Sequence, residues 1–217
     1  MSHILKELLL FFSIFLLLSC EKHQDIYFKD FAVVSAKIEA SEAGYEILKM
    51  GGNAFDAMIA TDLALAVVYP NAGNLGGGGF MVFRTADGEY GSLDYREKAP
   101  LASTKDMYLD EDNNVVKGLS SEGALSIGVP GTVAGLFEIY QRFGSLPLDS
   151  LFKPAMKLAK YGFPLTKKQA KSFNQNKRKI LSNSNNIDLF KKNFIEGMVF
   201  NNPALYSTLK FILENGK

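Results

Sequence analysis

The stretch from Ala54 to Val68 is apolar on nearly every side of a helical wheel. Asn53 can cap a helix at its start, and Tyr69 and Pro70 can stop one at its end. A helix without a polar face has to be buried, so other elements must enclose it. The sequence therefore predicts a domain built around this helix, whose alanines allow close packing.

Shorter patterns predict what surrounds the buried helix. Gly51 and Gly52 offer a left-handed stop to an amphipathic helix that precedes them, and Asp87-Gly88 is a strong hairpin signal. We expect helices layered on an antiparallel or mixed sheet, an α+β fold rather than a βαβ series. The expected elements are an amphipathic helix around 40–48, strands at 80–84, 90–96 and 124–129, and helices capped by Thr132 and spanning 149–161, 166–181 and 203–215.

The N-terminus predicts export. Leu8 to Leu18 is an apolar stretch too short to span a bilayer in the ordinary way, but suited to a signal peptide. Leu17-Leu18-Ser19-Cys20 resembles a bacterial lipoprotein box, so we expect a signal peptide at 1–19, lipidation of Cys20, a tether at 20–30 and the body at 31–217. Glu21 then favours the outer membrane, with the protein in the periplasm or at the cell surface. A plain secretory signal and a short uncleaved anchor remain alternatives.

The distribution of reactive residues excludes several kinds of chemistry. The sole cysteine is Cys20 and the only histidines are His3 and His23, so the body contains no Cys nucleophile, His base or Cys/His zinc site. With 24 basic and 23 acidic residues the net charge is +1, which gives no argument for a nucleic-acid partner. Residues 151–187 are basic without any acid, and we interpret them as solvated helix faces, helped by a nearby anionic membrane.

The glycine run at 76–79 does not match a nucleotide site. A P-loop requires Gly-Lys-Ser/Thr at the start of a helix, and a dinucleotide-binding turn follows a strand. Here the expected order is reversed, because a helix precedes the run and a strand follows it. Two interpretations remain, a tight corner between helix and strand, or backbone that can approach a neighbouring chain or ligand closely and adopt positive φ.

Arg96 is the candidate binding residue. A guanidinium donates two parallel hydrogen bonds to a carboxylate, which makes it a natural clamp for an acidic ligand. Strand alternation places Asp94 on the same face, so an ion pair between the two residues is the competing interpretation. The residues alone favour the ion pair.

Six short strings follow one another along the body, from about residue 31 towards the last residues. They are VVSA (33–36), ASEAG (40–44), ILKMGGNAFDA (47–57), NAGNLGGGGFM (71–81), DYREKAP (94–100) and GVPGTVAG (128–135). In this order they resemble the N-terminal part of γ-glutamyltranspeptidases, and the set is far more specific than any one string alone.

The resemblance implies a fold and a reaction. It implies an N-terminal-nucleophile hydrolase with an αββα sandwich, made as a precursor that cuts itself into a large and a small subunit. In that family the threonine exposed by the cut attacks the γ-glutamyl amide of glutathione and passes the acyl group to water or an amino acid. The resemblance further implies that no cofactor is needed and that Arg96 binds the α-carboxylate of the γ-glutamyl group.

The chain also departs from that family. At 217 residues it is well under half of a typical precursor, so we expect an incomplete sandwich, with the rest of the large subunit and the small subunit as missing partners. None of its threonines matches the processing threonine, and Lys37-Ile38-Glu39 is more polar than the usual segment. Two hypotheses follow: a piece of a γ-glutamyltransferase that is inactive alone, or a non-catalytic, lipid-anchored remnant that binds γ-glutamyl carboxylates.

Overall fold

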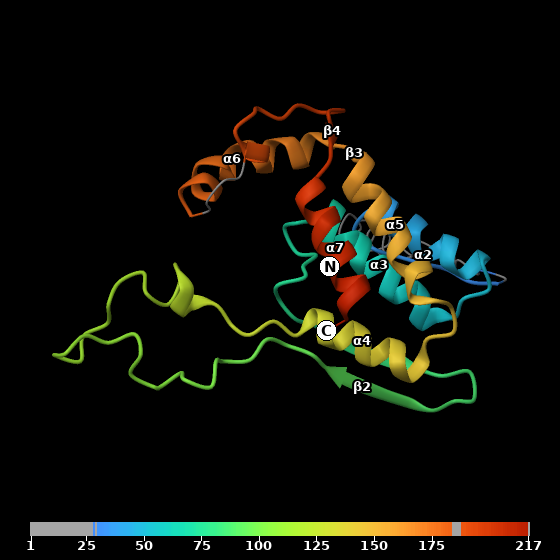
Figure 1. Cartoon of the computed structure of the whole chain (residues 1–217), viewed down its shortest axis with the longest axis horizontal. Coiled ribbons are helices and arrows are strands. Elements are labelled where there is room, and N and C mark those ends of the chain that lie inside the picture. The colour runs from blue at the N-terminus through green and yellow to red at the C-terminus, as the bar shows by residue number, and fades with distance from the viewer. Residues whose placement is uncertain (1–27, 29, 184–187, 217) are drawn as a thin grey trace, which may run out of the picture. The chain divides into compact units, whose positions relative to one another are not determined.

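The computed structural model describes residues 28, 30–183 and 188–216, and its elements are shown in Figure 1. The chain divides into two compact units, of which the first ends at Ala32. The expected signal peptide, Cys20 and nearly all of the tether lie outside the described residues. The second unit contains, in order, α2 (Ile38–Lys49), α3 (Ala54–Val68), β1 (Phe80–Arg84), β2 (Tyr90–Asp94), α4 (Thr132–Phe143), α5 (Leu148–Tyr161), β3 (Phe163–Pro164), α6 (Lys167–Ser182), β4 (Val199–Phe200) and α7 (Pro203–Asn215).

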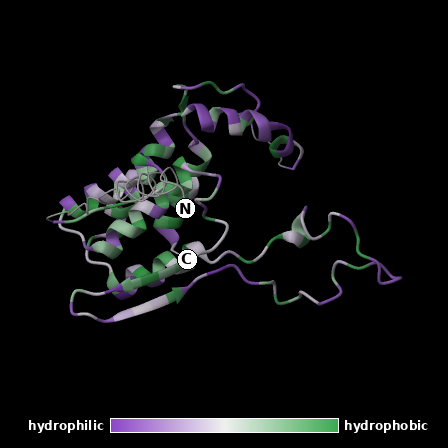
Figure 2. Ribbon diagram, turned by 180° about the vertical axis from the view of Figure 1, so that it is seen from behind, coloured by the Kyte–Doolittle hydropathy of each residue, from purple (hydrophilic) through white to green (hydrophobic). Residues whose placement is uncertain are grey.

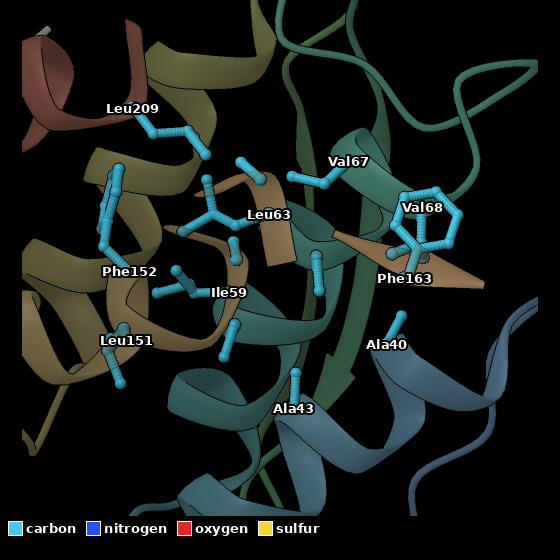
Figure 3. Packing of buried hydrophobic residues seen from close by; sticks show 14 of the residues in the cluster. Ala40, Ala43, Ile59, Leu63, Val67, Val68, Leu151, Phe152, Phe163 and Leu209 are labelled. Carbon is cyan, nitrogen blue, oxygen red and sulfur yellow. The ribbon is translucent and has the colours of Figure 1, made fainter. Parts of the chain in front are cut away.

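Helix α3 forms the centre of the core, as its composition predicts. Ile59 and Leu63 have almost no exposed surface, and α2, α4 and α5 pack around the helix (Figure 3). Each such side chain stabilises the fold by roughly 1.5–3 kcal/mol on leaving water. The predicted start of α3 and the predicted end of α2 are both confirmed. Asn53 caps α3 in a reciprocal capping box with Asp56, and Gly51 takes φ 90° after α2.

Strands β1 and β2 form the predicted antiparallel hairpin, with Phe80 paired to Asp94 and Arg84 to Tyr90. The inward side carries Met81, which is buried in the core. The outward side leaves Phe80, Val82 and Tyr90 exposed, the last two with 85% of their surface accessible. One face of this hairpin is therefore packed, and the other is open, with these three apolar side chains among the exposed polar residues Arg84, Ser92 and Asp94.

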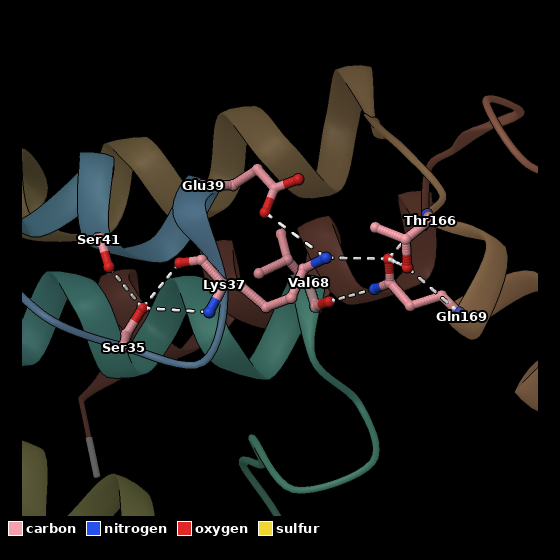
Figure 4. Close-up of polar contacts among 7 residues, drawn as sticks. All are labelled: Ser35, Lys37, Glu39, Ser41, Val68, Thr166 and Gln169. Atoms are coloured by element: carbon pink, nitrogen blue, oxygen red, sulfur yellow. Dashed lines mark hydrogen bonds and ion pairs between the residues drawn. The ribbon is translucent and has the colours of Figure 1, made fainter. Parts of the chain in front are cut away.

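A polar cluster joins α2, α3 and α6 at the Lys37 segment (Figure 4). The Lys37 ammonium donates to Gln169 Oε1 at 3.0 Å and lies 3.8 Å from Glu39 Oε2. Gln169 Nε2 in turn donates to the carbonyl of Val68 at 2.8 Å, at the end of α3. The unusually polar Lys37-Ile38-Glu39 segment thus has a structural use, since it ties three helices together.

Two predictions at 124–132 are wrong. Instead of a strand, the chain forms a short 3₁₀ helix at Ala124–Ser126, and only Val129 makes an isolated bridge, to Lys98. Thr132 is not a helix cap, because Gly131 occupies that position. The Thr132 side chain is buried instead and donates to Asn74 Oδ1 at 2.6 Å, so a tertiary contact outweighs the local preference.

The C-terminal helices are confirmed to within one residue at each end. Thr166 caps α6 in a second capping box with Gln169, and α7 spans Pro203–Asn215. Helix α7 packs on α5, and β3 pairs antiparallel with β4. In the part of the chain that the structure describes, no helix combines the length and apolarity needed to cross a bilayer.

Candidate functional site

Arg96 lies at the mouth of a cavity of about 340 Å³ between the end of β2 and the start of α4. The cavity is also lined by Tyr95, Lys98 and Pro130, and by Glu138 on α4. Arg96 itself is exposed, so its guanidinium is accessible from solvent. Asp94 lines the cavity as well, so the site combines two cationic side chains and two carboxylates around an aromatic and a proline surface.

Two glycines hold the segment before Arg96 in place. A Cβ at Gly131 would lie 1.9 Å from the carbonyl oxygen of Tyr95, and one at Gly135 would lie 2.3 Å from Tyr95 Cγ. No larger residue fits at these distances without moving the strand or the helix. The first turn of α4 is therefore seated directly on Tyr95, and this contact fixes the backbone from which Arg96 projects.

The glycine run supports the same segment from the other side. Tyr95 and Gly79 exchange backbone hydrogen bonds of 3.0 and 3.4 Å, and the Gly77 carbonyl accepts from the amides of Gly131 and Thr132. None of the residues 76–79 takes a positive φ. The structure therefore favours close backbone approach, in which the run packs between the strand end and the start of α4.

The competing ion pair between Asp94 and Arg96 is absent. Asp94 Oδ1 instead accepts from the backbone N–H of Arg96 at 2.9 Å. Within the described residues, no carboxylate lies within 4.0 Å of the Arg96 guanidinium. Asp94 therefore shapes the backbone and leaves the guanidinium unpaired.

The carboxylate of Asp62, on α3, also affects the electrostatics around Tyr95. Burial raises the pKa of Asp62, on α3, to about 6. Burial also raises the pKa of the Tyr95 hydroxyl, and the negative charge of Asp62 adds to that increase. The signal in the sequence was an acidic residue inside an otherwise apolar helix, and our sequence analysis gave it no role.

Lys98 and Glu138 line the same cavity as Arg96, and neither was predicted from the sequence. Lys98 lies two residues further along the same strand direction and could have been found from alternation. Glu138 lies one turn after Ala134 and Gly135, so it shares their face of α4. That this face packs on Tyr95, just after β2, is a tertiary fact that helical spacing does not supply.

The threonine hydroxyls are mostly engaged within the fold. Thr61 and Thr208 donate to carbonyls one turn earlier, Thr166 caps α6 and Thr132 bonds to Asn74. Among the described residues, no three His, Cys, Asp or Glu side chains gather closely enough to hold a metal ion.

Comparison with known proteins identifies relatives along most of the body. The family model for gamma-glutamyltranspeptidase matches residues 40–217. The glutathione hydrolase proenzyme of Pseudomonas aeruginosa is 43% identical over 185 residues, which is 85% of this chain and 33% of that protein. The corresponding proenzyme of Pseudomonas sp. strain A14 is 55% identical over 133 residues, covering 61% of this chain and 23% of that protein.

Solved structures show the same similarity. The γ-glutamyltranspeptidase of Helicobacter pylori superposes with a TM-score of 0.83 and 42% identity, over 89% of this chain and 56% of that one. The transpeptidase CapD of Bacillus anthracis superposes with a TM-score of 0.70 at 30% identity. The fold is thus part of the N-terminal-nucleophile hydrolase architecture, as predicted. The chain spans about a quarter to a third of the length of the two Pseudomonas proenzymes. The chain belongs to the γ-glutamyltranspeptidase family.

Proposed function

We propose that this chain is the γ-glutamyl-binding part of an enzyme that hydrolyses glutathione and transfers its γ-glutamyl group. Arg96 binds the α-carboxylate of the γ-glutamyl group through two parallel hydrogen bonds. The observation that carries this proposal is the unpaired, exposed guanidinium at a cavity of about 340 Å³, held by the packing of Tyr95. Lys98 adds positive charge beside it and strengthens the attraction for an anionic substrate.

The proposed reaction needs a nucleophile from outside these residues. A threonine at a newly formed N-terminus attacks the γ-glutamyl amide carbon, its own α-amine takes the hydroxyl proton, and the amine of the leaving group departs. The acyl-enzyme then passes the γ-glutamyl group to water or to an amino acid. The hydroxyls of Thr61, Thr132, Thr166 and Thr208 are hydrogen-bonded within the fold. Because no threonine of this chain matches the processing threonine of the family, we expect the chain alone to be inactive.

The open face of the β1–β2 hairpin is an argument that a partner segment packs there. Phe80, Val82 and Tyr90 expose apolar surface on one face of the hairpin, and exposed apolar surface of this kind is characteristic of an interface. We propose that the remainder of the large subunit and the small subunit cover this face. The small subunit would then bring the threonine towards Arg96.

An activity assay tests the proposal. The chain is expressed alone and together with the reading frame that follows Lys217 in the genome, and release of the chromophore from a γ-glutamyl anilide is measured. We expect activity only in the combined protein. Arg96→Ala should lower kcat/KM by about 100-fold, since a charge-assisted pair contributes roughly 1.5–3 kcal/mol, and Arg96→Lys should raise KM because it removes the planar fork.

Arg142→Ala is the matched control, because Arg142 is exposed in the last turn of α4 and lies outside both the cavity and the open hairpin face. Turnover by the isolated chain that disappears in Arg96→Ala would contradict the need for an outside nucleophile. Wild-type kinetics in the combined Arg96→Ala protein would remove Arg96 from the site. A downstream region without the small subunit would favour the non-catalytic remnant, to be tested by glutathione binding to the chain alone.

We further propose that residues 1–19 are a lipoprotein signal peptide, that Cys20 is lipidated, and that residues 20–30 tether the body to the outer membrane. Metabolic labelling with an alkyne fatty acid should mark the wild-type chain but not Cys20→Ser. Labelling of Cys20→Ser at wild-type intensity, or retention of residues 1–19 in the labelled protein, would refute this expectation.

A further inference from the structure

Helix α6 has six basic residues and neither Asp nor Glu. Five of them are exposed, and at 100° per residue they fall within an arc of about 120° on one side of the helix. We call this set the α6 basic face; it consists of Lys167, Lys168, Lys171, Arg178 and Lys179. Figure 2 shows α6 as a largely hydrophilic helix.

The opposite side of α6 is fixed to the body. Ala170 and Phe173 are buried there, and the Phe173 ring lies 5.1–5.5 Å from the rings of Phe190, Phe194 and Phe200. Asn174 holds the Phe194 backbone through hydrogen bonds of 2.8 and 3.0 Å. The charges are therefore presented by a rigid helix and keep a constant arrangement.

The fold itself makes no use of these charges. Within the described residues, none of the five side chains has a carboxylate within 4.0 Å. Lys167 and Lys168 also occupy the first turn, where the helix dipole is positive and a cation is unfavourable. Lys177, at the edge of the set, is the one that bonds internally, to Asn193 Oδ1 at 3.1 Å. A uniformly cationic surface that costs local stability fits an anionic partner outside the chain.

Headgroups of anionic phospholipids match this surface better than nucleic acid does. Binding of single-stranded nucleic acid relies on exposed aromatic rings between the charges, whereas the only aromatic residue of α6, Phe173, is buried. A bilayer surface requires only a planar array of cations, each contributing roughly 1 kcal/mol. The expected anchor at Cys20 and a tether of residues 20–30 would keep the body within about 40 Å of a membrane.

We propose that the α6 basic face docks on the surface of an anionic phospholipid bilayer. Docking would place α6 against the headgroups and restrict the orientation of the body relative to the membrane.

Vesicle co-sedimentation of the full chain tests this proposal. Binding is compared between phosphatidylcholine vesicles and vesicles that also contain phosphatidylglycerol, because the apolar N-terminal segment contributes equally to both. We expect binding that is tighter on the anionic vesicles and weakens as salt is raised. The variant Lys167→Gln/Lys168→Gln/Lys171→Gln should lose at least about tenfold of that anionic preference.

The control is Lys105→Gln/Lys117→Gln/Lys210→Gln, which removes the same charge from exposed lysines outside residues 151–187. Equal binding to both vesicle types, or an equal loss in the control, would overturn the proposal. So would a short DNA oligonucleotide that binds the basic face more tightly than the anionic vesicles do, since the face would then be a nucleic-acid site.

Discussion

Replacing Asp56 by alanine should remove a large part of the stability of the fold. The Asp56 carboxylate is fully buried at the third residue of α3. One oxygen accepts from the Asn53 amide at 3.0 Å, and the other accepts from the Ser145 amide at 3.0 Å; the Ser145 hydroxyl also donates to this carboxylate. This one side chain therefore begins α3 and ties it to the loop after α4.

The expected loss follows from the two amide donors. A hydrogen bond to a charged group contributes about 1.5–3 kcal/mol, so two such bonds would suggest about 3–6 kcal/mol. Ser145 is exposed, and water can replace part of what its amide and hydroxyl lose. We therefore expect Asp56→Ala to lower the free energy of unfolding by about 3 kcal/mol, a large share of the 5–15 kcal/mol typical of a domain.

Urea denaturation followed by far-UV circular dichroism measures this difference. Asp56→Asn should fall between wild type and Asp56→Ala, because its amide keeps one acceptor oxygen but no charge. Asp149→Ala is the matched control, since Asp149 is an exposed acid in the first turn of α5. A loss below about 1 kcal/mol in Asp56→Ala would show that the buried carboxylate is not the link described above.

Two further predictions concern the surroundings of Arg96. Burial raises the pKa of Asp62 to about 6, so its ionised form destabilises the fold above that pH. Asp62→Asn should therefore be more stable than wild type by about 2–3 kcal/mol near pH 8. This advantage should shrink as the pH falls from about 6 to about 4, because the wild-type carboxyl then becomes protonated. A difference in urea midpoints that stays constant with pH would contradict this prediction. Gly135→Ala should lower the melting temperature because its methyl group would meet Tyr95, whereas Gly76→Ala, which has open space, should not; equal melting temperatures would disprove the close contact.

Local signals were sufficient for most of the secondary structure. Asn53 and Thr166 cap helices through neighbours three residues away, and Asp87-Gly88 turns a hairpin between adjacent strands. The strand predicted at 124–129 was wrong because this segment pairs with no sheet, so alternation alone was misleading. The prediction that Thr132 caps a helix was wrong because the side chain bonds instead to Asn74, which is distant in the sequence.

The same division applies to the candidate site. Arg96 was found from its motif, but the sequence placed it at the end of a strand spanning 90–96, whereas β2 ends at Asp94. The Arg96 guanidinium forms no ion pair with Asp94, because the Asp94 carboxylate accepts a hydrogen bond from the Arg96 backbone N–H instead, and alternation does not predict this bond. Glu138 and Asp62 reach the region only through the packing of α4 and α3, which requires the tertiary structure.

The position of α3 in the chain has a consequence for synthesis on the ribosome. Its apolar surface is covered in part by α5, which ends roughly 90 residues later. At about 5–20 residues per second, the part of α3 that α5 covers stays open for roughly 5–20 seconds after it is made. During that interval its surface resembles the apolar segments that chaperones bind, and under the export that we propose above the chain would be threaded through a translocation pore before this packing forms.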